Sequence, residues 1–206
     1  MNKKLYIGLG GTARAGKDTF CAIAKKQLES RGLKVKRFAL ADELKNDLED
    51  FIREKLDMDV YTQITSEKDI IRPILVGYGD SMRKKTQGTY WTDKVSNSIA
   101  KDDSDVIIVT DIRYDEYEKD ELYWMKDVLG GVVVHVSKYS IRFNPYFMDG
   151  KEKQWVIPAN DHEARNDPKI KKKADFVVEW EHQEGNIMES AYLNSIVSNV
   201  LDKIQK

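Results

Sequence analysis

Two kinds of hydrophobic pattern alternate along the chain. Short, almost continuous apolar runs predict strands at residues 5–10, 35–40, 105–110, 131–136 and 174–178. Apolar side chains at helical spacing predict helices that follow residue 17 and cover residues 42–56, 66–85, 89–100 and 187–204. The runs at 105–110 and 131–136 are continuous rather than alternating, which is typical of parallel strands covered on both faces.

The first predicted strand leads directly into a glycine-rich loop and then a helix. Gly11 and Gly16-Lys17 have the spacing G-x-x-x-x-G-K of a P-loop. Such a loop turns its backbone N–H groups toward a phosphate chain, while the lysine and the helix N-terminus favour anions. Asp18 stands where Ser or Thr commonly holds magnesium, and Thr19 follows. The segment predicts nucleoside triphosphate binding, and a glycine-rich turn capped by Asp18 is the structural alternative.

Strands that alternate with helices predict an α/β protein with a three-layer P-loop NTPase fold. We expect a parallel sheet of about five strands with helices on both faces. The length of 206 residues suits one domain, residues 1–206. Ligands in such folds collect at the carboxyl ends of the strands, where the P-loop and Asp111 both belong. Asp42, at the start of a predicted helix, is interpreted as its N-cap.

One region does not fit this scheme. Residues 138–165 show no sustained period and are interrupted by Pro145, Gly150 and Pro158. The basic residues of this region are Lys138, Arg142, Lys151, Lys153 and Arg165. A long loop of this kind suits a lid-like insertion over bound phosphates, with an ordinary solvated insertion as the alternative.

Composition and charge limit the expected binding partners and cellular location. A net charge of -1 provides no overall basic field, so we expect neither membrane nor direct nucleic-acid binding. The single cysteine, Cys21, excludes an internal disulfide framework and is predicted to be buried in the first helix. The N-terminal apolar run is too short for a signal peptide or a membrane span. We therefore expect a cytoplasmic protein.

The segment that follows the 105–110 run carries candidate chemistry. Asp111 is well placed for a magnesium shell, and Arg113 could grip a phosphate with two hydrogen bonds. The alternative is that Asp111 caps a turn and Arg113 forms a surface ion pair. The cationic side chains that could converge on phosphates are Arg14, Lys45, Arg72, Arg83 and Arg113.

No residue is obviously required as a general base. His162 and Glu163 could form an acid–base pair, but a solvated histidine is the simpler interpretation. An acceptor that is already a phosphate anion needs no base. The chain also lacks the N-K-x-D motif of GTP-binding switches and is short for a motor ATPase. A small kinase acting on a phosphorylated acceptor fits best.

Several short motifs occur together in a characteristic order. They lie at residues 16–19, 39–45, 72–79, 90–91 and 110–113. In this combination the chain resembles the deoxynucleoside monophosphate kinases of tailed bacteriophages. The resemblance implies that ATP and Mg²⁺ are used to convert deoxynucleoside 5′-monophosphates to diphosphates. For a phage protein, the location would be the host cytoplasm.

The resemblance, together with the motifs above, assigns roles to individual residues. ATP would be bound by Gly11, Arg14, Gly16, Lys17, Asp18 and Thr19. The monophosphate would be bound by Leu44, Lys45, Arg72, Gly79, Trp91, Arg113, Tyr114 and Glu118. The catalytic residues would be Lys17, Arg14, Asp111 and Arg113. The magnesium candidates are Asp18, Thr19 and Asp111.

Some choices stay open from the sequence. Tyr117 stands where the family carries an acid, and Glu116 and Glu118 flank it; Glu118 is the one assigned to the site. Trp91 could offer a face to a base or sugar, or simply be a core tryptophan. Kinases for dephospho-coenzyme A or phosphomevalonate share much of the architecture, and an ATP-binding interaction protein without catalysis is a third hypothesis. An exposed face on the helices predicted in residues 66–101 would suit a homodimer.

Overall fold

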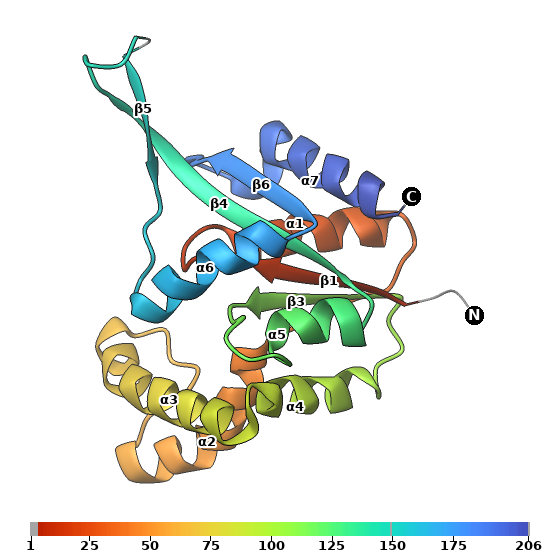
Figure 1. Ribbon diagram of the computed structural model, residues 1–206, viewed down its shortest axis with the longest axis vertical. Helices are drawn as coiled ribbons and strands as arrows, with labels where there is room; N and C mark the ends of the chain where they lie inside the picture. Colours follow the sequence, from red (N-terminus) through yellow and green to blue (C-terminus); the bar gives the residue numbers. More distant parts are fainter. Residues whose placement is uncertain (1–3, 149, 206) are drawn as a thin grey trace.

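The computed structural model describes residues 4–148 and 150–205, and its centre is a six-stranded sheet (Figure 1). The strands are β1 (Leu5–Gly10), β2 (Val35–Phe38), β3 (Val106–Ile112), β4 (Val132–Phe143), β5 (Lys151–Trp155) and β6 (Phe176–Glu181). The helices are α1 (Lys17–Ser30), α2 (Leu40–Leu56), α3 (Thr65–Thr86), α4 (Thr89–Ile99), α5 (Glu121–Tyr123), α6 (Asp161–Lys173) and α7 (Ala191–Ile204). A π-helical turn, η1 (Trp124–Val128), follows α5, and a 3₁₀ turn, η2 (Ile187–Glu189), precedes α7.

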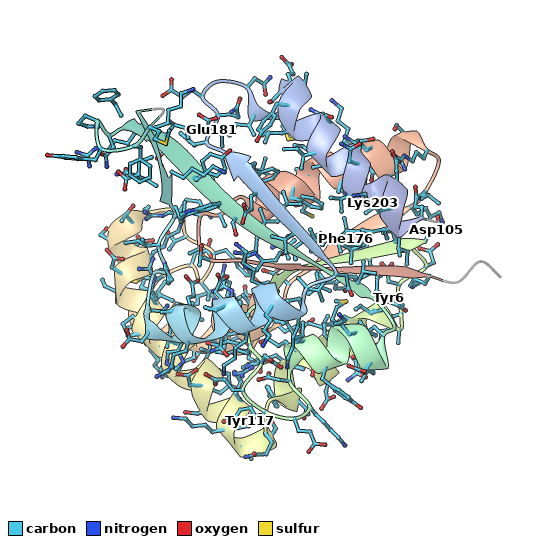
Figure 2. All side chains as sticks on the ribbon, turned by 45° about the horizontal axis from the view of Figure 1, so that its top comes forward. Tyr6, Asp105, Tyr117, Phe176, Glu181 and Lys203 are labelled. Atoms are coloured by element: carbon cyan, nitrogen blue, oxygen red, sulfur yellow. The ribbon has the colours of Figure 1, made fainter. Side chains whose placement is uncertain are left out.

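The pairing of the strands confirms the predicted sheet. β1 lies between β3 and β4, β2 pairs with β3, and β6 pairs with β4, all in parallel. The parallel part therefore has the order β2-β3-β1-β4-β6. β5 is an antiparallel addition that pairs only with the C-terminal half of β4. Figure 2 shows Tyr6, Asp105 and Phe176 where the parallel strands begin and Glu181 at the opposite, carboxyl edge.

Helices cover both faces of this sheet, as predicted. One apolar cluster joins the sheet to α1 and α7, and a second joins it to α4, η1 and α6. Neighbouring residues of β3 supply opposite faces, with Ile108 in the first cluster and Ile107 in the second. This arrangement explains the continuous apolar run. Cys21 is buried in the first cluster, which confirms that prediction.

The helices α2, α3 and α4 form a helical lobe beside the β2–β3 edge of the sheet, at the bottom of Figure 1. The lobe has a small apolar core of its own around Ile52, Val60 and Ile71. It is linked to the main sheet through α4, whose apolar side belongs to the second cluster. The lobe carries most of the residues expected at the monophosphate site.

Two of the predicted helices have wrong boundaries. The helix expected from Asp42 begins at Leu40, with Ala39 at its N-cap position, and Asp42 lies in the first turn. The Asp42 carboxylate instead pairs with the Arg37 guanidinium at 2.7 Å. The helix predicted over 187–204 is divided into η2 and α7 because Ser190 caps α7, accepting a hydrogen bond from the Leu193 N–H.

The segment 138–165 is more regular than its sequence predicted. β4 continues to Phe143 and forms a hairpin with β5, and α6 begins at Asp161. The hairpin projects beyond the sheet at the upper left of Figure 1, with Phe143 76% and Tyr146 94% exposed. Its apolar side chains therefore leave no buried stripe of the kind on which the sequence prediction relied.

Candidate functional site

The phosphate-binding loop lies between β1 and α1, and its shape requires glycine at two positions. Gly11 has φ +128° and Gly16 has φ +97°. A Cβ atom at Gly11 would lie 2.2 Å from the Val136 carbonyl oxygen, and one at Gly16 would lie 2.6 Å from the Trp180 ring. Any larger residue would collide with β4 or β6. The two glycines of the motif are thus explained by packing behind the loop.

Lys17 is buried at the start of α1 and turns back onto the loop. Its Nζ donates hydrogen bonds to the carbonyl oxygens of Gly11 at 2.7 Å and Thr12 at 2.8 Å. Burial, followed by the nearby Arg113 guanidinium, lowers the pKa of Lys17 to about 8. The lysine therefore carries a charge that is costly without an anionic partner, which suits a phosphate ligand.

Trp180, in β6, supports the loop from behind. Its indole Nε1 donates a hydrogen bond to the Ala15 carbonyl oxygen at 3.0 Å. Its ring also packs against Phe20 of α1, with the ring centroids 6.3 Å apart. No pattern in the sequence pointed to this residue, because Trp180 lies beyond the strand predicted at 174–178.

Asp111 lies near the end of β3 and is buried. Its Oδ1 accepts from the Leu40 N–H and its Oδ2 from the Ala41 N–H, each at 2.8 Å. The carboxylate thus satisfies the first backbone donors of α2, where the helix dipole also favours a negative charge. Asp111 fixes the helical lobe to the carboxyl edge of the sheet and also lies close enough to Lys17 to raise its pKa, against the effect of burial.

Arg113 leaves the end of β3 with its side chain 45% exposed. The N–H groups of Arg113 and Tyr114 both donate to Glu121 Oε2, at 2.6 Å and 3.0 Å. Burial raises the pKa of Glu121 to about 8, although the Arg83 guanidinium opposes this shift. Glu121 was not expected from the sequence, and it determines how the backbone presents Arg113.

Arg83, expected among the phosphate-directed cations, is instead committed to a buried ion pair. Its guanidinium makes two hydrogen bonds to Asp120, at 2.9 Å and 2.8 Å, and lies 3.6 Å from the centre of the Tyr114 ring. Glu121 lies 3.2 Å from the same guanidinium. Since Arg83 has two buried carboxylate partners, its role is to hold the segment that follows β3.

The first turns of α6 lie against the loop. Glu163 Oε2 accepts from the Ala13 N–H at 3.2 Å, and Glu163 Oε1 lies 3.8 Å from Arg113 Nη1. His162 points elsewhere, with Nε2 3.5 Å from Asp80 Oδ2 of α3, so the two neighbours have different partners. A small pocket at this place is lined by Gly11, Ile112, Arg113, Glu163, Asp167 and Ile170.

The residues expected at the monophosphate site are only partly brought together. Trp91 is 4% exposed, and its Nε1 donates to the Gly79 carbonyl oxygen at 3.4 Å. Leu44 packs beside Gly79, where an added Cβ would lie 3.4 Å from Leu44 Cδ2. Tyr78 and Tyr90 pack edge-on against Trp91, which is therefore a core residue in this structure.

The charged members of that set lie outside this core. The Arg72 guanidinium is exposed and lies 3.5 Å from the Asp69 carboxylate. The Lys45 ammonium lies 5.0 Å from the centre of the Tyr61 ring. Glu118 is exposed in the turn after β3 and has no hydrogen bond or ion pair within residues 4–148 and 150–205. None of these three side chains forms part of a preformed phosphate clamp.

Oxygen donors for a cation are present at the start of α1. Asp18 is exposed and Thr19 is half-buried, one and two residues beyond Lys17. The described residues contain no group of three or more His, Cys, Asp or Glu side chains that could hold a metal ion. Magnesium normally keeps water and substrate phosphate ligands, so this sparse donor set fits an ion that arrives with a nucleotide.

Comparisons with known proteins give similar solved structures but no sequence family. No family model matches the chain, and no curated protein does so. A shikimate kinase from Aquifex aeolicus has a TM-score of 0.48 and 16% identity, covering 98% of this chain and 96% of that chain. A shikimate kinase from Acinetobacter baumannii in complex with shikimate has a TM-score of 0.45 and 14% identity, covering 100% and 97%.

A shikimate kinase from Bacteroides thetaiotaomicron has a TM-score of 0.40 and 15% identity, covering 98% of this chain and 99% of that chain. With these TM-scores, the assignment of the P-loop fold rests on the strand order and loop of the chain itself. Within the described residues, every helix is too short or too polar to cross a membrane.

Proposed function

We propose that the protein is a kinase that transfers the γ-phosphoryl group of ATP to a deoxynucleoside 5′-monophosphate. The observation that carries this proposal is the position of Arg113 beside the phosphate-binding loop. Glu163 bridges the two, since one carboxylate oxygen accepts from Ala13 of the loop and the other lies 3.8 Å from Arg113. A protein that only binds ATP needs no second cation there, whereas phosphoryl transfer to an anionic acceptor does.

Each residue has a role in this proposal. The loop from Gly11 to Gly16 would hold the ATP phosphates through its N–H groups, with Lys17 on the outer oxygens. Arg14, at φ 65° on the exposed side of the loop, would lie between donor and acceptor. Arg113 would hold the acceptor phosphate. An acceptor phosphate is already anionic, so the transfer needs no general base.

Asp18, Thr19 and Asp111 are the three candidates for holding magnesium. The ion supplies charge neutralisation on the phosphates when it is bound. Asp18 and Thr19 are accessible, whereas each oxygen of Asp111 already accepts a hydrogen bond from α2. We therefore assign the direct contact to Asp18 or Thr19 and the orientation of α2 to Asp111.

The acceptor would bind between the sheet edge and the helical lobe. Leu44, Gly79 and Trp91 would form its apolar wall, with Trp91 supporting the wall from the core. The charged groups that would complete the site are Lys45, Arg72, Tyr114 and Glu118. Among the residues that the structure describes, Arg72 is held by an exposed ion pair, which costs little to break. It can therefore turn toward a phosphate when one binds.

Two larger features belong to the same proposal. The segment 138–165 would act as a lid that excludes water during transfer, which limits hydrolysis of ATP. A homodimer would form through an exposed face of the helices in residues 66–101, where Ile70 and Val76 of α3 are accessible. Sedimentation at several concentrations tests the dimer, and Ile70→Lys should shift it to monomer.

A coupled ADP-release assay with ATP and magnesium tests the reaction. The acceptor panel contains deoxynucleoside and ribonucleoside monophosphates, dephospho-coenzyme A and phosphomevalonate. Strong stimulation by one or more deoxynucleoside monophosphates supports the proposal and gives the base preference. Stimulation by another acceptor alone would support the assignment as a kinase and would change the assigned substrate. ATP binding with no stimulation by any acceptor favours a non-catalytic ATP-binding protein.

A further inference from the structure

An acidic side chain occupies the mouth of the phosphate-binding loop. The Glu163 side chain is 10% exposed. Its Oε2 accepts from the Ala13 N–H at 3.2 Å and from the Ala159 N–H at 2.9 Å, while its Oε1 faces Arg113 Nη1 at 3.8 Å. One carboxylate thus bridges a backbone N–H of the loop and a guanidinium. Both of these groups can bind an oxyanion.

Capping of α6 explains only part of this arrangement. Asn160 accepts from the Glu163 N–H at 2.9 Å and Glu163 accepts from Ala159, a reciprocal pair like a capping box. Helix capping requires neither the contact with Ala13 nor the approach to Arg113. Those two contacts place a negative charge beside a loop whose other features favour an anionic ligand.

We propose that Ala13 and Arg113 form a phosphate subsite, and that Glu163 occupies it until a substrate phosphate displaces it. The inference rests on the proposed function and adds an internal competitor to that site. A donor phosphate at the Ala13 N–H, or an acceptor phosphate at Arg113, would compete with the carboxylate for that contact. The first turn of α6 must then move away, and the bound state costs the energy of breaking these contacts.

The rest of α6 is anchored, so the movement is confined to its first turns. Further along the helix, Asp167 Oδ1 lies 3.0 Å from Nε2 of the buried His135 in β4. Asn166 donates to Glu116 at 2.9 Å, which ties α6 to the segment after Arg113. The first turn also reaches α3 through His162 and Asp80. Displacement of Glu163 would therefore change the contact between α6 and the helical lobe.

Binding of tripolyphosphate and of Mg-ATP, measured by isothermal titration calorimetry, tests the proposal. Glu163→Gln keeps a side chain that can cap α6 and removes the charge that competes with phosphate. The apparent Kd equals the intrinsic Kd divided by the fraction of binding-competent molecules, so Glu163→Gln, which frees a mostly occupied site, should lower the apparent Kd of both ligands about threefold to tenfold. Asp161→Asn is the matched control, because it makes the same charge change at an exposed position of α6. It should stay within about twofold of wild type.

The outcomes separate this inference from the proposed function. Unchanged or weaker binding by Glu163→Gln, with wild type binding normally, overturns the inference alone. Equal tightening by Asp161→Asn also overturns it, because the effect would then be a general change of charge. Absence of Mg-ATP binding in wild type overturns the proposed function. If Glu163→Gln is unstable, Glu163→Ala must give the same tightening.

Hydrogen exchange gives an independent readout on the wild-type protein. Amides of residues 159–165 should exchange faster when tripolyphosphate binds, because their contacts with the loop are broken. Amides of β1 should not accelerate. Unchanged or slower exchange in residues 159–165 would contradict displacement of Glu163.

Discussion

The indole of Trp180 and the backbone of Ala15 are joined by a buried hydrogen bond of 3.0 Å from Nε1 to the carbonyl oxygen. The same ring leaves no space for a Cβ at Gly16, where the distance would be 2.6 Å. The phosphate-binding loop is therefore shaped by a residue of β6, the last strand of the sheet along the chain. Its conformation depends on the completed fold and not on the loop sequence alone.

Trp180→Phe should lower both stability and nucleotide affinity. The replacement keeps an aromatic ring but leaves the Ala15 carbonyl oxygen without its partner, which costs about 1–3 kcal/mol in a buried site. Urea unfolding gives the free energy change, and calorimetry gives the affinity. Trp155→Phe, on the exposed hairpin, is the control and should change stability by less than about 0.5 kcal/mol. Equal effects of the two substitutions would contradict the proposed support of the loop by Trp180.

The pKa of Lys17 predicts how phosphate binding depends on pH. Its pKa is about 8 in the ligand-free protein, and an adjacent phosphate anion would raise it. Binding must therefore take up a proton above about pH 8, and affinity falls as the pH rises through that value. Below it the lysine is already charged, so affinity levels off. Calorimetry at about pH 9 in buffers of different ionisation enthalpy measures the proton uptake.

Lys17→Met is the control for this effect, because it has no titrating ammonium and should show no such uptake. A wild-type affinity that stays constant through about pH 7 to 10 would contradict the assignment of Lys17 to the phosphate.

Arg83→Met should destabilise the fold strongly. It removes the counter-ion of Asp120 and Glu121, which are both buried, and such a loss costs about 3–5 kcal/mol. Denaturant unfolding measures the loss, with the exposed Arg72→Met as a control that should stay within about 0.5 kcal/mol. Without Arg83 the pKa of Glu121 rises further above its value of about 8, so the part of the defect due to Glu121 should grow as the pH rises above about 8 and be lost below it. A small, pH-independent effect would contradict the buried network.

Arg113→Ala should damage use of the acceptor while leaving the fold intact. The side chain is 45% exposed, so unfolding free energy should change by less than about 0.5 kcal/mol. Loss of a charge-assisted phosphate contact should raise the acceptor KM or lower kcat, by about tenfold or more. Arg113→Lys should recover only part of the loss because it cannot bind with two parallel hydrogen bonds. Unchanged acceptor KM and kcat would exclude Arg113 from the site.

The parts of the fold that could be predicted depend on residues close in sequence. The glycine spacing from Gly11 to Lys17 and the apolar run at 105–110 carry their own signals. The whole of α6 was missed, although Asn160 and Glu163 have capping-box spacing, because Asn166 and Ile170 are its only buried residues within the described chain. With Pro168 inside it as well, the helix shows no apolar stripe.

The supporting contacts of the site could not be predicted for a different reason. Trp180 meets Ala15 across 165 positions of sequence, and Arg83 meets Asp120 across 37. Arg83 therefore resembled a phosphate-directed cation until the fold paired it with a carboxylate. Local patterns identify residues that can bind phosphate, but the tertiary structure decides which of them remain available.

The most direct test follows the phosphoryl group itself. Wild-type protein is incubated with magnesium, γ-labelled ATP and a mixture of deoxynucleoside monophosphates, and the labelled products are separated. We expect label in a deoxynucleoside diphosphate, little in inorganic phosphate, and none in either product with Lys17→Ala. Label that appears only in inorganic phosphate, or that reaches the acceptor equally well with Lys17→Ala, would contradict phosphoryl transfer at this loop.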